Sequence, residues 1–80
     1  MTTVEAVLEV MDDVLGLDKA EMSEMLDADL FEEGLLDSLS VITLLQSLED
    51  VVGHPIEIEK MAPEDLATVN RLAQAVDKQV

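Results

Sequence analysis

With 80 residues, the chain is long enough for one small domain with a single core, and we expect residues 1–80 to form it. Its 19 acidic residues outnumber four basic ones, and this net charge of −15 argues against nucleic acid and favours a basic patch on another protein as partner. The sequence has no cysteine, no signal-peptide pattern and no apolar run near the roughly 20 residues that cross a bilayer, so we expect a cytoplasmic protein without disulfides or membrane insertion.

Residues 2–15 are predicted to form the first helix. Apolar residues recur in this stretch at the i, i+3, i+4, i+7 spacing of a helix that faces a core: Val4, Val7, Leu8, Met11, Val14 and Leu15. Thr2 and Glu5 have the spacing of a capping box, in which each side chain accepts a hydrogen bond from the backbone of the other residue. Gly16 is a suitable residue for ending this helix.

Residues 16–36 form a long connection for so small a domain. The segment is too apolar for a flexible linker, since it contains Met22, Met25, Leu26, Leu30, Phe31, Leu35 and Leu36. We therefore predict an ordered loop that packs over the helices, with a helical turn near residues 20–26. Long ordered loops are usually functional, so this loop is a candidate part of the site.

The acidic residues of this loop raise the question of a calcium site. An EF-hand loop needs oxygen ligands at positions 1, 3 and 5, glycine at position 6 and glutamate at position 12. A loop starting at Asp29 places Phe31 and Ser40 at ligand positions, and a loop starting at Asp27 places Glu32 where glycine is required. Both registers fail, and no metal site is predicted.

Residues 38–52 are predicted to form the main helix of the fold. Its apolar face consists of Val41, Leu44, Leu45, Leu48 and Val52. Asp37 is well placed as the N-cap, because its carboxylate can accept backbone N–H bonds that the first turn leaves unsatisfied. Ser38 then lies in the first turn, where the helix dipole and the free N–H groups favour a phosphate on its hydroxyl. An Asp-Ser pair alone often does no more than begin a helix.

The remainder of the chain is predicted to contain one short and one longer helix. Residues 53–55 break the main helix, and residues 56–58 should be briefly extended. Pro63 followed by acidic residues indicates a short helix near residues 62–66, and Thr68 is placed to cap the last helix. The apolar face of the last helix is Val69, Leu72, Ala73 and Val76. The sequence thus predicts an all-α four-helix bundle with three main helices, one short helix and a long ordered loop between the first two main helices.

The stretch from Asp29 to Leu39, Asp-Leu-Phe-Glu-Glu-Gly-Leu-Leu-Asp-Ser-Leu, closely resembles the attachment motif of the acyl carrier proteins. In that family a Leu-Phe pair precedes a glycine, then an apolar pair, then Asp-Ser-Leu. The resemblance extends over most of the chain, including residues 55–56 and 68–69. It implies that Ser38 carries a covalent 4′-phosphopantetheine arm, whose thiol holds an acyl or aminoacyl group as a thioester. It also implies that Asp37, besides capping the helix, assists attachment by helping to place Mg²⁺ and the cofactor.

The resemblance further implies a monomeric carrier that is not an enzyme and that serves several. These partners are a phosphopantetheinyl transferase, an acyl- or aminoacyl-activating ligase, and a downstream acyltransferase or synthase. The candidate partner contacts along the main helix are Leu39, Thr43, Gln46, Glu49 and Asp50. Leu39 leads this set, because the helical period places it away from the apolar face and family members use this residue to contact partners.

The docking helix departs from the pattern of many fatty-acid carriers, which have acidic residues two and five positions after the modified serine. Those positions are Ser40 and Thr43, and acidic residues return only at Glu49 and Asp50. This acid-poor face is more similar to carriers served by adenylating ligases, such as D-alanyl and other aminoacyl carriers. The sequence does not decide the cargo, and fatty-acid, polyketide and nonribosomal-peptide synthesis are the alternative pathways.

Two functions of other classes compete with a carrier. A hydrolase would use Ser38 as nucleophile and His54, the only histidine, as base, but the sequence lacks a G-x-S-x-G elbow and an evident oxyanion hole. A cofactor-free acidic helical protein-interaction module suits the composition and the predicted bundle equally well. Covalent modification of Ser38 separates the carrier from this alternative.

Overall fold

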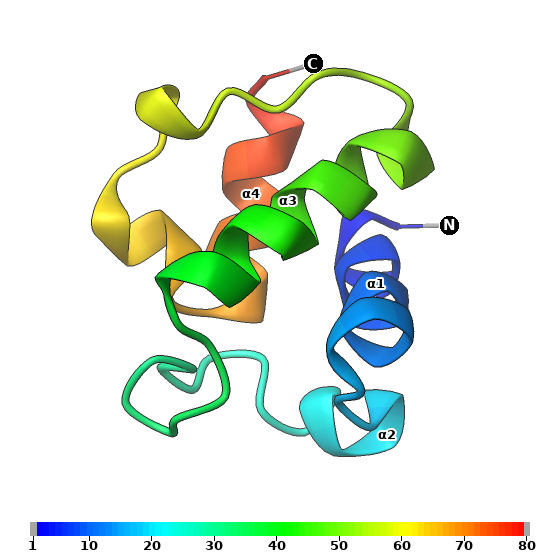
Figure 1. The fold of residues 1–80 in the computed structure, drawn as a ribbon, viewed down its shortest axis with the longest axis vertical. Coiled ribbons are helices and arrows are strands. Elements are labelled where there is room, and N and C mark those ends of the chain that lie inside the picture. Colours follow the sequence, from blue (N-terminus) through cyan, green and yellow to red (C-terminus); the bar gives the residue numbers. More distant parts are fainter. Residues whose placement is uncertain (1, 80) are drawn as a thin grey trace.

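The computed structural model describes residues 2–79, which contain four α-helices, two short 3-10 helices and no strand (Figure 1). In chain order the elements are α1 (Thr3–Leu15), α2 (Lys19–Met22), α3 (Ser38–Val52), η1 (Ile58–Lys60), η2 (Pro63–Leu66) and α4 (Val69–Asp77). Helix α1 packs against both α3 and α4, and α3 runs diagonally across the molecule. The predicted all-α four-helix fold is confirmed. No helix within residues 2–79 is long and apolar enough to cross a membrane.

Thr2 caps helix α1 as predicted, but the Glu5 carboxylate contacts the Thr2 hydroxyl and not the Thr2 backbone N–H that a capping box requires. The Thr2 hydroxyl oxygen accepts a bond from the Glu5 backbone N–H at 3.1 Å, and the Glu5 carboxylate accepts a bond from the same hydroxyl at 3.3 Å. The helix ends at Gly16, whose φ of 68° is the left-handed conformation that favours glycine. The buried face differs from the prediction, because Ala6 and Val10 are buried while Val14 is exposed. Because α1 packs against both α3 and α4, its buried face is centred closer to Ala6 and Val10 than predicted.

The core is aliphatic, as the single aromatic residue of the chain requires. The side chains that are almost completely buried are Val7, Met11, Met22, Leu30, Leu44, Leu48, Val69, Leu72 and Val76. They come from α1, α2, α3, α4 and the segment between α2 and α3. The apolar faces predicted for α3 and α4 are therefore confirmed, with Val52 at the edge of the α3 face and partly buried.

The connection between α1 and α3 is ordered and packs on the core. Its helical turn, α2, is shorter than predicted and starts earlier, because Asp18 caps it by accepting the Ala20 N–H at 3.0 Å. Met22, Leu30 and Leu36 are buried, whereas Phe31 is more than a third exposed. We call residues 23–37 the site loop, because they lead directly into α3.

The short helix predicted near residues 62–66 is the 3-10 helix η2. A second 3-10 helix, η1, begins at Ile58, at the end of the segment that was expected to be extended. Both are single turns of three or four residues. Pro63 starts η2, and the Asp65 carboxylate accepts the Ala62 N–H at 3.1 Å. Helix α4 then starts as predicted, because the Thr68 hydroxyl accepts the N–H of Arg71 at 3.0 Å.

Candidate functional site

The first turn of α3 is built by Asp37. Its carboxylate accepts the Ser40 backbone N–H at 2.8 Å, and its carbonyl oxygen accepts the Val41 N–H at 3.0 Å. The predicted N-cap and both predicted ends of α3 are therefore confirmed. Ser38 is the first residue of the helix, and it is exposed. Its hydroxyl thus belongs to the positive end of the α3 dipole.

The hydrogen bonds of Asp37 also set its charge. The Ser40 backbone N–H first, and the Ser40 hydroxyl second, hold the pKa of the Asp37 carboxyl below its ordinary value. The residue next to Ser38 is therefore a carboxylate throughout the neutral range. Oxygen ligands of this kind suit Mg²⁺, so the site has one candidate oxygen ligand for a metal that accompanies a phosphate.

The lowered pKa of Asp37 predicts a pH-dependent contribution to stability. A carboxyl whose pKa is lower in the folded state stabilises the fold at a pH above its unfolded pKa, about 3.9, and this contribution disappears as the pH falls through the folded pKa. We expect NMR titration of the side-chain carboxyl carbons to give Asp37 a pKa below the ordinary value of an aspartate, about 3.9. In Asp37→Asn this contribution is absent at every pH, so the free energy of unfolding should decrease less steeply on acidification than in the wild type. An Asp37 titration at or above the ordinary aspartate value contradicts the capping account.

The site loop holds this turn in place through Leu30, which is completely buried. The carbonyl oxygen of Leu30 accepts the N–H groups of Leu35 and Leu36 at 2.9 and 3.1 Å. The loop can close in this way because Gly34 takes a φ of 75°, in the left-handed region. Only Asp37 lies between the last of these hydrogen bonds and Ser38, so the position of Leu30 fixes the position of the serine.

The candidate partner contacts share one side of α3. At 100° per residue, the five predicted positions fall within about a third of the helix circumference. They are Leu39, Thr43, Gln46, Glu49 and Asp50. Leu39 has 74% of its surface exposed, whereas Glu49 is partly buried. The Thr43 hydroxyl is engaged with the Leu39 carbonyl oxygen at 3.2 Å, which leaves its methyl group as the freer contact.

Ile42, which was not among the predicted contacts, is 45% exposed on the same side of α3. Its spacing of three residues from Leu39 was the available signal. Ile42 and Gln46 line a shallow hollow of about 270 Å³, whose opposite wall is Ile56 and Ile58. These two isoleucines come from the segment after α3, so no local pattern could have placed them beside the helix. The exposed apolar surface near Ser38 is thus larger than Leu39 alone.

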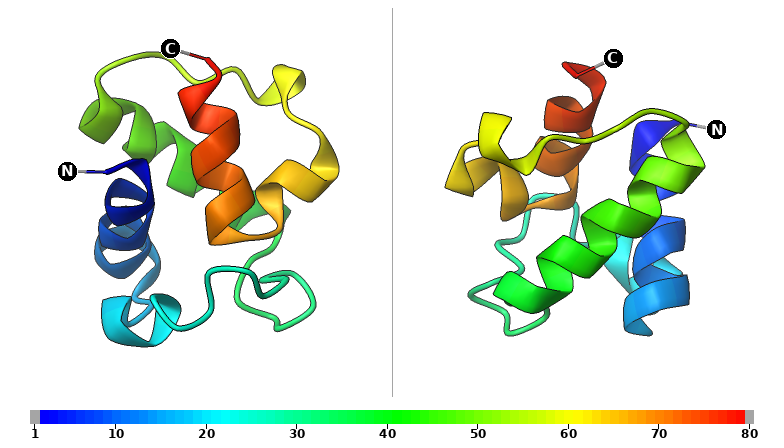
Figure 2. Two further views of the ribbon diagram at one scale, coloured as in Figure 1. Left: turned by 180° about the vertical axis from the view of Figure 1, so that it is seen from behind. Right: turned by 45° about the horizontal axis from the view of Figure 1, so that its top comes forward.

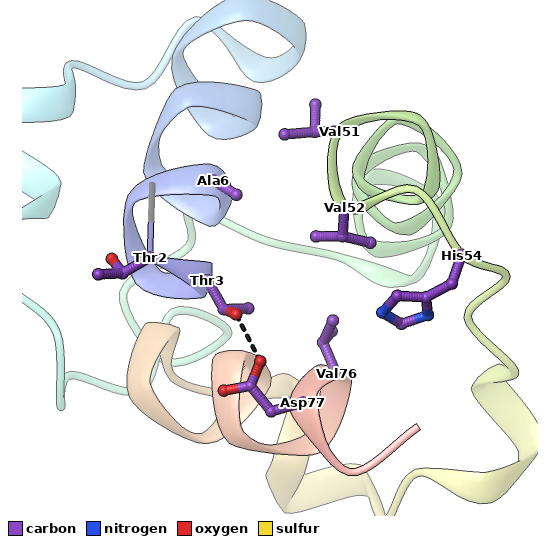
Figure 3. Close-up of a pocket in the computed structure, with 8 residues that line it drawn as sticks. All are labelled: Thr2, Thr3, Ala6, Val51, Val52, His54, Val76 and Asp77. Carbon is purple, nitrogen blue, oxygen red and sulfur yellow. Dashed lines mark hydrogen bonds between the residues drawn. The ribbon is translucent and has the colours of Figure 1, made fainter. Parts of the chain in front are cut away.

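The opposite end of α3 holds the histidine that a serine hydrolase would need. Figure 3 shows His54 at the rim of a pocket of about 260 Å³, which lies between α3 and the ends of α1 and α4. Across this pocket the Thr3 hydroxyl donates a hydrogen bond to the Asp77 carboxylate. The rise of an α-helix places His54 about 20 Å from Ser38. His54 therefore cannot serve as a base for Ser38, and the catalytic pair that the hydrolase alternative requires is not formed.

Comparison with known proteins defines the class of the molecule. The family described as "Phosphopantetheine attachment site" matches residues 5–76. The chain belongs to this family. It is a carrier protein with a covalently attached 4′-phosphopantetheine, and it holds acyl or aminoacyl groups for partner enzymes. Nothing supports the alternative of a cofactor-free interaction module.

The relatives that match the chain over nearly its whole length are D-alanyl carrier proteins. The chain is 32% identical to a D-alanyl carrier protein of Streptococcus equi subsp. zooepidemicus (strain MGCS10565) and 35% identical to one of Streptococcus pyogenes serotype M5 (strain Manfredo). Each comparison spans 78 residues, which are 98% of this chain and 95% of the relative. No solved structure matches the chain.

Within residues 2–79, no group of three or more His, Asp or Glu side chains is arranged to hold a metal ion.

Proposed function

We propose that the arm is attached to the Ser38 hydroxyl and that Asp37 assists the attachment. The observation that carries this proposal is the exposed serine in the first turn of α3, directly after a carboxylate that stays ionised. A phosphate on Ser38 would be stabilised by the α3 dipole. The Asp37 carboxylate can hold Mg²⁺ beside this oxygen while a phosphopantetheinyl transferase moves the arm from coenzyme A. The Ser38 oxygen loses its proton and bonds to the phosphorus of the arm, and the pyrophosphate bond of coenzyme A breaks to release adenosine 3′,5′-bisphosphate.

We also propose that the cargo is an amino acid, with D-alanine as the first candidate. Two observations support this cargo: the names of the relatives, and the replacement of two usual docking acids by Ser40 and Thr43. An adenylating ligase would load the thiol, and a downstream acyltransferase would remove the cargo. The carrier itself would work as a monomer in the cytoplasm and would catalyse neither step.

The experiment for this proposal has two stages with separate readouts. The unmodified protein is incubated with a broad-specificity phosphopantetheinyl transferase, coenzyme A and Mg²⁺, and intact mass should show the gain of one arm. A D-alanine-activating ligase with ATP should then add one D-alanyl group, which hydroxylamine removes because it is a thioester. L-Alanine and a fatty acid with its own ligase are the matched controls.

Each stage can fail on its own. Absence of the arm after treatment with several transferases contradicts the attachment proposal. A protein that gains the arm but accepts the fatty acid better than D-alanine contradicts the cargo proposal and leaves the attachment proposal intact.

A further inference from the structure

We propose that Asn70, in the first turn of α4, is a positioning residue for the attachment serine, although it is distant from Ser38 in the sequence. This inference rests on the proposed attachment at Ser38. Figure 2 shows the site loop passing beside the start of α4. The Asn70 backbone N–H donates to the Leu26 carbonyl oxygen at 3.0 Å, and its side-chain amide donates to the Asp27 carboxylate at 2.8 Å. One residue of α4 thus holds two consecutive residues of the loop.

A third hydrogen bond extends this connection to the serine. The Leu30 N–H donates to the Ala67 carbonyl oxygen at 2.7 Å, just before α4 begins. The Leu30 carbonyl oxygen then accepts the N–H groups of Leu35 and Leu36. A series of hydrogen bonds therefore runs from Ala67, which precedes α4, through Leu30 to the residue before Asp37, and it joins the loop to the same end of α4 as the Asn70 contacts.

The connection stabilises both of its ends. The first N–H groups of any α-helix lack partners within the helix, and the Leu26 carbonyl oxygen satisfies the one that belongs to Asn70. Between residues 22 and 37 the site loop contains no helix or strand, so contacts with α4 and the core determine its conformation. Weakening the contact at Asp27 should release the loop, and with it Ser38, while α4 stays folded.

Asn70→Asp tests this directly. The substitution keeps the size of the side chain but removes the amide donor and places a second carboxylate against Asp27. It should not weaken α4 itself, because the first turn of α4 has no acidic residue and a carboxylate there interacts favourably with the helix dipole. A loss of site geometry without a loss of α4 is therefore the expected signature of a positioning role.

The first measurement is the kinetics of arm transfer with the unmodified protein as substrate. If the loop is competent for only a fraction of the time, the apparent affinity falls by that fraction, so we expect KM to rise about fivefold with kcat unchanged. The second measurement is amide hydrogen exchange in the unmodified protein. Exchange at Leu35 and Leu36 should become faster, while exchange at Leu72 and Ala73 in α4 should not change.

The paired variant Asp27→Asn with Asn70→Asp restores the hydrogen bond with donor and acceptor exchanged. It should return KM and loop exchange to within about twofold of the wild type, as expected for a direct coupling between the two side chains. Thr3→Val is the matched control, because it removes another hydrogen bond to an exposed aspartate, Asp77, at the far end of the molecule. It should leave both readouts unchanged.

Three outcomes would overturn the inference: no effect of Asn70→Asp, no recovery in the paired variant, or an equal rise in KM for Thr3→Val. If the wild type gains no arm at all, the attachment proposal fails instead. The exchange measurement on the unmodified protein still decides whether Asn70 holds the loop.

Discussion

Ser38→Ala is expected to abolish the gain of the phosphopantetheine arm, even after long incubation with excess transferase and coenzyme A. The reason is chemical, since the substitution removes the oxygen that would accept the phosphate. The fold should be unaffected, because Ser38 is exposed and the cap of α3 is made by the Asp37 carboxylate with the Ser40 backbone. The measurements are intact mass for the arm and the melting temperature for the fold.

Ser40→Ala is the matched control for this result. It removes the next hydroxyl of the same helical turn, which is the weaker of the two Ser40 contacts that lower the Asp37 pKa, and leaves the backbone N–H that caps the helix. This variant should gain the arm with the same stoichiometry as the wild type, and digestion should locate the arm on Ser38. An arm that persists in Ser38→Ala, or that is lost in Ser40→Ala, would assign the attachment to another residue.

Leu39→Ala should impair loading by the amino-acid-activating ligase far more than Glu49→Gln or Asp50→Asn on the same helix. Leu39 is 74% exposed and lies next to Ser38, so its truncation should cost the isolated carrier little stability. An apolar anchor at the centre of an interface commonly contributes about 2 kcal/mol, which corresponds to about 30-fold in kcat/KM for loading. The measurement is loading rate against the concentration of carrier already bearing the arm, at two salt concentrations.

Two sets of controls separate docking from stability and from charge. Glu49→Gln and Asp50→Asn should change loading by less than about threefold, because charges at the rim of an interface contribute mainly to encounter rates. Leu44→Ala, in the core of the same helix, should cost about 2–5 kcal/mol of stability. A neutral Leu39→Ala combined with large losses in the two carboxylate variants would mean that docking is electrostatic.

The sequence predicted α3 and its cap correctly because both depend on residues close in the chain. A 3.6-residue apolar period and an aspartate before the first turn are sufficient to place Ser38 at a helix start. The buried face of α1 was less accurate, since Ala6 is buried only through contacts that two other helices make. Local pattern also could not distinguish a short α-helix from the single 3-10 turn of η2.

The parts of the site that could not be predicted join residues that are distant in the sequence. Ile56 and Ile58 meet Ile42 only because the chain folds back along α3 after Gly53. The Asp27–Asn70 hydrogen bond joins residues 43 positions apart, and no sequence pattern around either residue indicates that they pair. These residues do not belong to a periodic pattern, so only the folded structure shows that they lie close together.

The pocket at the far end of α3 has a practical consequence. Thr2, Thr3 and Asp77 line it together with Val52, so both ends of the described part of the chain lie about 20 Å from Ser38. A fluorophore, an affinity handle or a surface tether joined at either end would therefore stand clear of the first turn of α3. The carrier can be immobilised in one orientation, and successive enzymes can be passed over it while the serine and the Leu39 side of α3 face the solution.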